Sequence, residues 1–331
     1  MTADWLRSYA RARGGNTACW GNKASGGNGA SGGNGASGRK IGWAVAHLAL
    51  TLGFVTRQFR QVDVFTETPY FGNPVAVVLG ADGLSDEQMQ LLARWTNLSE
   101  TTFVLAPRAR GADYWVRIFT PARELPFAGH PTLGTCHAWL EAGGRPARAG
   151  QAVQECAAGL ITVRQTEAGL AFAAPPLVRG GPVEDAVTED VARALNIARA
   201  DIVDIQWADN GPGWVAVLLA SADAVLAVRP GTVDMEIGVA GPYPDGSPEA
   251  LEVRAFSPQL GAPGEDPVTG SLNASLAQWL LATARVKAPY VASQGTALGR
   301  RGRVHISRDD DGQVWVGGGT VTCVSGTVEL G

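Results

Sequence analysis

From residue 57 onward, the chain is built of short runs that are rich in β-forming residues and either alternate apolar with polar residues or are apolar throughout. Both patterns are typical of β-strands, half buried in the first case and fully buried in the second. The segments predicted as strands are 58–65, 74–79, 101–106, 114–119, 159–164, 170–173, 202–207, 214–219 and 251–256, with a β-rich tail at 304–329.

Helical spacing appears in fewer places. After Ser85 apolar residues recur at helical intervals, and Gln88 stands at the capping-box position three residues further on. Residues 131–142 are small or apolar and end at Gly143-Gly144, which predicts a buried helix with a glycine stop. Further helices are predicted at 189–195, 222–228 and 271–284. Strands outnumber helices and do not alternate with them regularly, so the sequence predicts an α+β fold.

A short internal repeat divides the chain. Residues 116–121 read Val-Arg-Ile-Phe-Thr-Pro and residues 253–258 read Val-Arg-Ala-Phe-Ser-Pro, 137 positions later. Carried forward without a gap, this offset places Gly129 opposite Asp266. Each copy leads through a loop into a buried helix, so we expect two similar halves whose helix N-termini face a shared cleft.

The predicted domains are a first half at 57–170 and a second half at 171–331, with the last strands able to return to the first half. Residues 1–56 differ from both, because residues 24–38 repeat Ala-Ser-Gly-Gly-Asn-Gly and cannot bury enough apolar surface to fold. The apolar run 41–55 is shorter than the roughly 20 residues of a membrane-spanning helix. We expect a disordered extension, read from a start codon set too early, with a targeting role as the alternative.

Composition excludes several classes of function. The 331 residues carry a net charge of −4 and no basic stripe, which argues against a nucleic acid partner. The four cysteines are scattered, so neither a disulfide framework nor a zinc site is predicted and a reducing cytoplasm fits. The sequence has no glycine-rich phosphate loop, and we expect no cofactor, no metal and no membrane partner.

His130 is the first candidate for chemistry. It precedes Pro131, a residue favoured at the first helical position, so His130 is expected at or near the helix N-cap. The free N–H groups and partial positive charge of a helix start suit a substrate carboxylate. The plain alternative is that His130 only caps the helix.

Asp266 and Glu100 are the other candidates. Asp266-Pro267 again reads as a cap followed by proline, with Ser271 close to the helix start, and an Asp cap alone stabilises a helix by about 1 kcal/mol. The Glu265-Asp266 pair could bind a metal ion, but no third ligand stands nearby.

Glu100 lies where a predicted helix gives way to an apolar strand. Such surroundings raise the pKa of a carboxyl group and suit a general base, although a solvated charge at a strand end is the alternative. A base, a histidine at one helix start and an aspartate at the other together indicate a site that removes a proton from carbon.

Four segments together resemble the PhzF family, named for an isomerase of phenazine biosynthesis. They are Phe71-Gly72-Asn73-Pro74, Asn97-Leu98-Ser99-Glu100-Thr101, Gly129-His130-Pro131-Thr132 and Glu265-Asp266-Pro267-Val268-Thr269-Gly270-Ser271, in family order. The resemblance runs from about Gln58 to the C-terminus. It implies a diaminopimelate-epimerase-like fold, in which each half curls a mostly antiparallel sheet around a central helix. It also implies a homodimer that uses neither cofactor nor metal.

The resemblance implies a role for each site residue. Glu100 would move a proton between two carbons of a small carboxylate-bearing substrate, which could be a cyclic amino or hydroxy acid. His130 and Asp266 would orient the substrate and stabilise charge. Gly129, Gly270 and Ser271 would hold its carboxylate, and Asn73 would support the site.

Related epimerases and racemases use two facing cysteines, and the resemblance assigns those positions to Gly129 and Asp266, which carry no thiol. One carboxylate base suits same-face proton migration, so the sequence favours an isomerase. An epimerase acting on another carbon acid and a non-catalytic small-molecule-binding homologue are the alternatives. Specificity is expected in the loops 242–248 or 261–264, and the substrate itself stays open.

Overall fold

The computed structural model describes residues 55–260 and 264–331. Arg57–Val328 form one compact unit that contains every candidate site residue. A second unit contributes Val55–Thr56 and Glu329–Gly331 to the described part, where Thr56 Oγ1 donates a 2.8 Å hydrogen bond to Glu329 Oε1. The prediction of a disordered extension concerns mainly residues 1–54, which lie outside the described residues. Its end at residue 56 coincides with the division between the two units, and strand β1 begins at Val55.

Eighteen strands of the described chain join into one hydrogen-bonded sheet. They are β1 (Val55–Val64), β2 (Asn73–Leu79), β3 (Glu100–Leu105), β4 (Tyr114–Phe119), β5 (Glu124–Leu125), β6 (Gln151–Cys156), β7 (Gly159–Thr166), β8 (Gly169–Ala173), β9 (Arg179–Pro182), β10 (Ile202–Asp209), β11 (Val215–Leu219), β12 (Ile237–Pro242), β13 (Leu251–Phe256), β14 (Glu265–Asp266), β15 (Tyr290–Gln294), β16 (Gly302–Arg308), β17 (Val314–Gly318) and β18 (Thr320–Leu330). Every strand predicted from the sequence is present.

Helices are fewer, as the α+β prediction requires. They are α3 (Asp86–Thr96), α4 (Gly129–Glu141), α5 (Asp185–Leu195), α6 (Ala222–Ala227) and α7 (Gly270–Ala282), with short 3₁₀ turns at Arg199–Asp201, Pro258–Leu260 and Thr296–Leu298. The predicted capping box is confirmed: Gln88 N donates to Ser85 Oγ, and Ser85 N donates to Gln88 Oε1.

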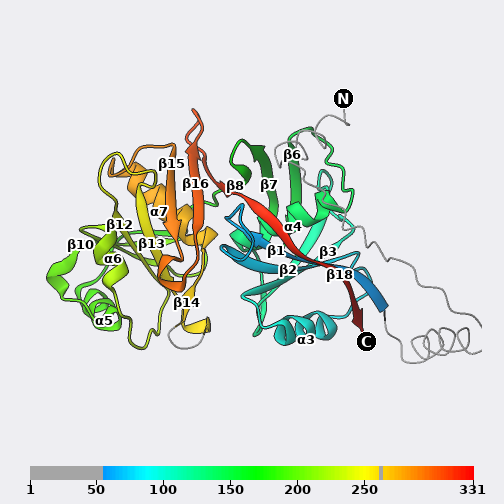
Figure 1. Cartoon of the computed structure of the whole chain (residues 1–331), viewed down its shortest axis with the longest axis horizontal. Coiled ribbons are helices and arrows are strands. Elements are labelled where there is room, and N and C mark those ends of the chain that lie inside the picture. The colour runs from blue at the N-terminus through cyan, green and yellow to red at the C-terminus, as the bar shows by residue number, and fades with distance from the viewer. Residues whose placement is uncertain (1–54, 261–263) are drawn as a thin grey trace, which may run out of the picture. The chain divides into compact units, whose positions relative to one another are not determined.

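Strands β1–β8 and β10–β17 repeat one series of pairings. In the first set β1–β2 is antiparallel, β2–β3 parallel, β3–β4 antiparallel and β4–β6 parallel. The second set repeats this order in β10–β11, β11–β12, β12–β13 and β13–β15. Figure 1 shows α4 among the strands of the first set and α7 among those of the second. The prediction of two similar halves, each a curled sheet around a helix, is confirmed.

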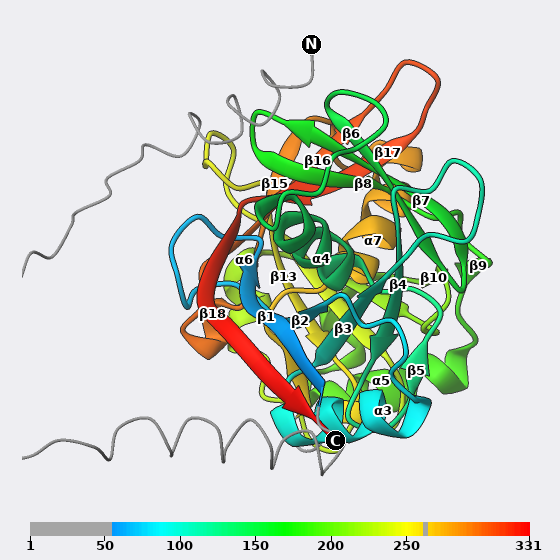
Figure 2. The same ribbon diagram turned by 90° about the vertical axis from the view of Figure 1, so that its right-hand side faces the viewer.

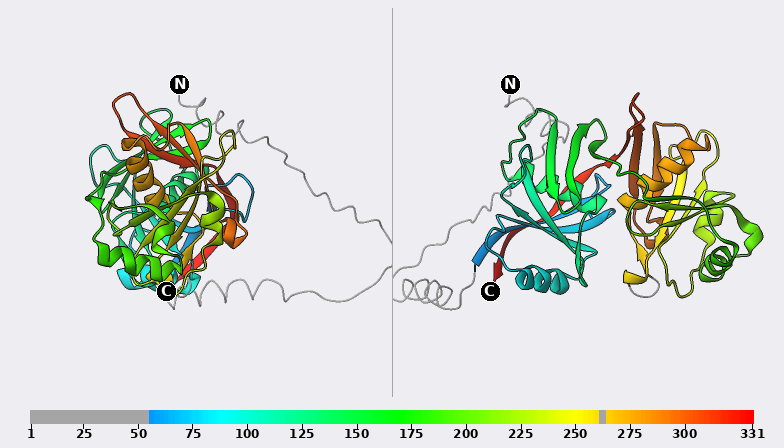
Figure 3. Two further views of the ribbon diagram at one scale, coloured as in Figure 1. Left: turned by 90° about the vertical axis from the view of Figure 1, so that its left-hand side faces the viewer. Right: turned by 180° about the vertical axis from the view of Figure 1, so that it is seen from behind.

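Two further strands, β9 and β18, each follow one set in the chain and pair with the first strand of the other set. β9 hydrogen-bonds to β10, while β18 pairs with β1. Figure 2 shows β18 in red running beside β1 in blue, and Figure 3 shows the same neighbours from behind. β17 also pairs with β8, so the two sets are joined by three strand pairings.

Both central helices are buried on nearly all sides, as a helix inside a curled sheet must be. α4 is buried from Gly129 to Ala138, and α7 is buried over most of its length. The surrounding strands make room with small residues. A Cβ atom at Gly238 of β12 would lie 2.2 Å from the Leu272 side chain of α7.

The gapless extension of the sequence repeat is wrong. α4 begins at Gly129 and α7 begins at Gly270, so the helices are 141 positions apart whereas the preceding strands are 137 apart. The second copy has four more residues between β13 and α7, in the segment that includes the 3₁₀ turn Pro258–Leu260. Gly129 therefore corresponds to Gly270 and not to Asp266.

Candidate active site

The N-terminal ends of α4 and α7 meet at the centre of the compact unit. A Cβ atom at Gly129 would lie 3.0 Å from Gly270 Cα and 2.8 Å from Phe172 Cζ. A Cβ atom at Gly270 would lie 3.1 Å from the His130 backbone nitrogen. Glycine at both positions is thus what lets two helix backbones approach so closely.

Neither helix start is capped by a side chain. The N-cap residues are Ala128 and Thr269, and neither makes a side-chain capping bond. Pro131 is the third helical residue rather than the first, still within the turn whose N–H groups have no partner inside the helix. The alternatives in which His130 or Asp266 merely caps a helix are wrong, because His130 lies inside α4 and Asp266 lies in β14. Two uncapped helix starts facing each other form an anion-binding arrangement.

Glu100 and His130 face each other beside these helix starts. Glu100 is the first residue of β3, and His130 is the second residue of α4. Their Oε2 and Nε2 atoms are 3.3 Å apart, with 14% of the Glu100 side chain and 5% of the His130 side chain exposed. Both atoms are buried, and neither takes part in a hydrogen bond among the described residues. Such unpaired polar atoms are costly and are expected where a ligand completes the site.

Burial keeps both side chains neutral, so this contact is not an ion pair. Desolvation raises the pKa of Glu100 to about 8, and the negative charge of Asp266 adds to the effect. Desolvation lowers the pKa of His130 to about 3, against an opposing hydrogen bond to the Pro74 backbone. His130 Nδ1 lies 3.4 Å from Asn73 Nδ2, but both protons of that amide go to Val268 O and Asp266 Oδ1. Nδ1–H is therefore assigned to the Pro74 bond, which leaves Nε2 as an acceptor. The raised pKa expected for Glu100 is confirmed.

Asp266 approaches from the other half of the fold. Its Oδ1 accepts a hydrogen bond of 2.9 Å from Asn73 Nδ2, and its Oδ2 accepts one of 2.6 Å from Thr269 Oγ1. Desolvation raises the pKa of Asp266 to about 6, and these two hydrogen bonds oppose that rise. A site at neutral pH therefore combines a neutral Glu100 with a mostly ionised Asp266.

Asn73 ties the two halves together. It is fully buried at the start of β2, and its Nδ2 donates to Val268 O at 2.9 Å as well as to Asp266. Its Oδ1 is buried and makes no hydrogen bond within the described chain. The preceding residue, Gly72, has no room for a side chain, since a Cβ atom there would lie 2.1 Å from Val64 O. This explains the Gly-Asn-Pro motif as a tight turn that aims an amide at Asp266.

Ser271 is held by two residues that the sequence pattern did not single out. Trp214 Nε1 donates to Ser271 Oγ at 3.1 Å, and Asn210 Nδ2 donates to Ser271 O at 2.9 Å. All seven predicted site residues thus gather around the two helix starts.

Glu265, considered as a metal ligand, is instead engaged by Arg254. The guanidinium donates to both Glu265 oxygens, at 2.9 and 2.7 Å, and the two side chains are almost fully buried. Cys136 is fully buried within α4, and burial raises the pKa of its thiol to about 12.

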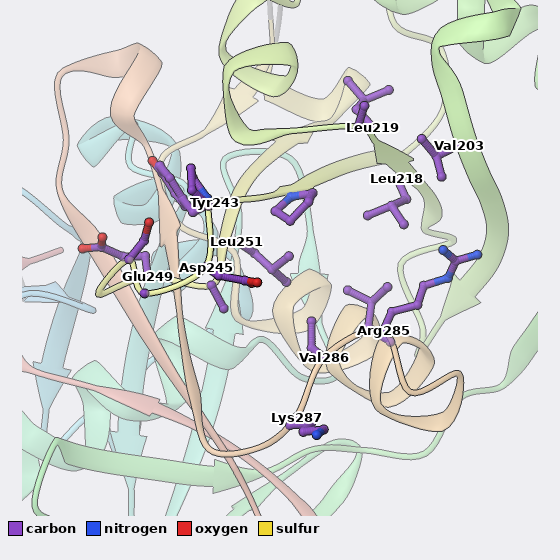
Figure 4. Close-up of a pocket in the computed structure, with 17 residues that line it drawn as sticks. Val203, Leu218, Leu219, Tyr243, Asp245, Glu249, Leu251, Arg285, Val286 and Lys287 are labelled. Carbon is purple, nitrogen blue, oxygen red and sulfur yellow. The ribbon is translucent and has the colours of Figure 1, made fainter.

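The loop 242–248, expected to set specificity, lies away from the two helix starts. A cavity of ≈ 730 Å³ lies between this loop and the C-terminal end of α7. Its lining includes Tyr243, Asp245 and Arg285, which Figure 4 labels. A helix of 13 residues is about 20 Å long, so the cavity is far along α7 from Gly270. Residues 261–263 of the other loop expected to set specificity lie outside the described residues.

Two sheet-wrapped helices with facing N-termini define the diaminopimelate-epimerase-like class of fold. The family model described as "Phenazine biosynthesis-like protein" matches residues 62–326. Trans-2,3-dihydro-3-hydroxyanthranilate isomerase of Pseudomonas fluorescens is 35% identical over 283 residues, covering 81% of this chain and 98% of that protein. Antisense-enhancing sequence 1 of Schizosaccharomyces pombe is 35% identical over 290 residues, covering 81% and 97%.

A solved structure agrees. The phenazine biosynthesis protein of the PhzF family from Bacillus anthracis superposes with a TM-score of 0.70 at 24% identity, covering 83% of this chain and 99% of that chain. The chain belongs to the phenazine biosynthesis-like (PhzC–PhzF) family and is a PhzF-like isomerase. Within the described residues, no helix is both long and apolar enough to span a bilayer.

Proposed function

We propose that the protein moves a proton between two carbons of a small carboxylate-bearing substrate without a cofactor, with Glu100 as both general base and general acid. The observation that carries this proposal is the buried Glu100 carboxyl group, whose Oε2 has no hydrogen-bond partner among the described residues and whose pKa is raised to about 8, beside two uncapped helix starts. A pKa near the working pH lets one carboxyl group accept a proton and then return it.

The site supports a simple sequence of steps. The substrate carboxylate binds the free N–H groups at Gly129, Gly270 and Ser271, where the two helix dipoles favour negative charge. Ionised Glu100 takes a proton from a carbon next to a double bond, and the electron pair of that C–H bond shifts along the unsaturated system. Protonated Glu100 then gives the proton to a second carbon on the same face. Overall one C–H bond breaks and one forms, with no net oxidation.

The neighbours of Glu100 fit supporting roles. His130 is neutral, so its Nε2 can accept a hydrogen bond from the substrate or from protonated Glu100. Asn73 Oδ1 offers a second buried acceptor. Because acceptors dominate this side of the site, a substrate bearing an amino or hydroxyl group beside its carboxylate would pair with them.

Proton-exchange NMR in heavy water tests the function. A panel of cyclic amino and hydroxy acids would include trans-2,3-dihydro-3-hydroxyanthranilate, chosen because a relative is named for an isomerase of that compound. We expect deuterium at a ring carbon of the true substrate, and Glu100→Gln should lower the exchange rate by about 10²–10⁴-fold.

Glu167→Gln, at an exposed turn between β7 and β8, is the matched control and should exchange at the wild-type rate. Near-normal exchange in Glu100→Gln would remove Glu100 from the mechanism. Inversion of a stereocentre in the recovered compound would instead favour an epimerase.

A further inference from the structure

Gln294 is a fully buried side chain at the end of β15, and its orientation is fixed by two backbone groups. Its Oε1 accepts from Thr269 N at 3.0 Å, which can only donate. Its Nε2 donates to Asp266 O at 3.3 Å, which can only accept. Asn273 Nδ2 also donates to Oε1, at 2.8 Å. The amide can therefore not be turned over without losing both backbone bonds.

This fixed amide sets the direction of the Thr269 hydroxyl. Gln294 Nε2 donates to Thr269 Oγ1 at 2.9 Å, so that oxygen is already an acceptor. A hydroxyl group has one proton, and it is left to point along the 2.6 Å contact to Asp266 Oδ2. The bonds thus run in one direction, from Gln294 to Thr269 to the Asp266 carboxylate.

The other carboxylate oxygen of Asp266, Oδ1, also accepts a hydrogen bond from a donor of fixed orientation. Asn73 Nδ2 donates to Val268 O, a backbone acceptor that fixes the Asn73 amide, and it also donates to Asp266 Oδ1. Each carboxylate oxygen of Asp266 therefore accepts from a donor, Thr269 Oγ1 or Asn73 Nδ2, whose orientation is fixed by its other hydrogen bonds. Hydrogen bonds of this kind favour the ionised carboxylate over the protonated one.

Other charges around Asp266 do not replace these donors. Glu236 and Glu265 both act against its ionisation, together with burial. Glu265 is paired with Arg254, and Glu236 accepts hydrogen bonds from Ser257 and Gln259 and feels the cation of Arg123. No positively charged side chain forms an ion pair with Asp266 among the described residues. The hydrogen bonds from Thr269 and Asn73 are therefore what oppose the rise in the Asp266 pKa that burial causes.

We propose that Gln294 and Thr269 are positioning residues that hold Asp266 as a fixed negative charge, so that Asp266 keeps the migrating proton on Glu100 and does not itself exchange a proton with substrate. The chain of hydrogen bonds from Gln294 through Thr269 to Asp266 is present in the free protein, and the contacts described above are sufficient to support it. Only the assignment of the migrating proton to Glu100 rests on the proposed function. The arrangement separates two buried carboxyl groups into one that stays charged and one that carries a proton.

This chain of hydrogen bonds is tested by NMR titration of the carboxyl carbons in the full-length free protein, labelled with ¹³C at Asp and Glu side chains. Asp266→Asn and Glu100→Gln assign the two signals by their disappearance. Thr269→Val removes the hydroxyl group at nearly constant shape, and Thr269→Ser restores it. No substrate is needed, so the result does not depend on whether the proposed reaction is correct.

A hydrogen bond to a charged group is worth about one pKa unit or more, so Thr269→Val should raise the pKa of Asp266 by about one unit. Asp266 would still be mostly ionised where Glu100 titrates, near pH 8, so the Glu100 titration should move little and the change should appear in the Asp266 titration. Thr269→Ser should titrate like the wild type.

Thr132→Val is the matched control. Thr132 also accepts from a buried glutamine, Gln154 Nε2 at 2.9 Å, but it donates to a backbone carbonyl, Ala128 O, at 2.9 Å. Its loss should cost stability while leaving both titrations unchanged. Unchanged titrations in Thr269→Val, or equal shifts in Thr132→Val, would overturn the proposal and reduce Thr269 to a packing role.

Discussion

Glu100 is a carboxyl group whose surroundings oppose its charge from two directions. Burial removes water from the carboxylate, and Asp266 adds a like charge nearby. The folded protein therefore pays to ionise Glu100, since the pKa is about 8 when folded and near 4.5 when unfolded. By linkage, the folded state loses stability as the pH rises from the unfolded value through the folded value.

This sign gives a prediction for Glu100→Gln. The variant cannot ionise, so it should be no more stable than the wild type at pH 4.5 and more stable by about 2–4 kcal/mol at pH 8.5. The change that should slow the proposed proton transfer should thus stabilise the protein at alkaline pH. Urea denaturation at several pH values measures the difference, with Glu167→Gln as the exposed control. A difference that stays constant with pH would show that Glu100 is not held neutral.

At the scale of elements, the decisive feature is the approach of two helix starts. Each of the two uncapped ends presents free N–H groups, and only the absence of side chains at Gly129 and Gly270 allows them to lie together. The distance between the helices is therefore set by backbone contact, which makes the site sensitive to a single added methyl group.

Gly129→Ala tests this sensitivity. The new Cβ atom would meet both Phe172 and Gly270, so we expect a loss of about 1–3 kcal/mol in stability from overpacking. Substrate turnover should fall together with affinity for any carboxylate ligand, because the two helix starts must separate. Gly326→Ala is the control, since a Cβ atom there would touch nothing within 4 Å. Wild-type affinity and stability in Gly129→Ala would contradict the close approach.

The sequence predicts most elements but not all that the site uses. The two buried helices, the capping box at Ser85 and the strands with strong apolar runs follow from local pattern. β12 was not predicted, because its two glycines weaken the strand signal; Gly238 makes space for Leu272 of α7, and Gly241 makes space for Ser221 and Val225. β15 was not predicted either, so Gln294 was not recognised as a buried residue. A glutamine at the end of a short strand has the local sequence pattern of a polar loop. The cap at Asp266 was misread because Asp-Pro is a common pair at a helix start, whereas here Asp266 lies in β14 and Thr269 is the N-cap of α7.

At the scale of the whole molecule, the exchanged strands explain why two similar halves form one unit. β9 leaves its own set to pair with β10, β18 pairs with β1, and β17 pairs with β8. Asn73 adds a polar link from β2 to Asp266 and Val268 across the site. A half cut from the chain would lose neighbours along several strands and leave their backbone groups unpaired.

We therefore expect one cooperative thermal transition for the compact unit, with calorimetric and van't Hoff enthalpies that agree. Residues 57–182 expressed alone should fail to fold, because β1 would lack β18 and β8 would lack β17. Co-expression with residues 183–331 should restore folded protein, since the missing strands can pair between two chains as they do within one. Differential scanning calorimetry and the yield of soluble fragment measure both outcomes. Two separate transitions, or a stable isolated half, would mean that the exchanged strands contribute little, and that each half is held by its own curled sheet and central helix.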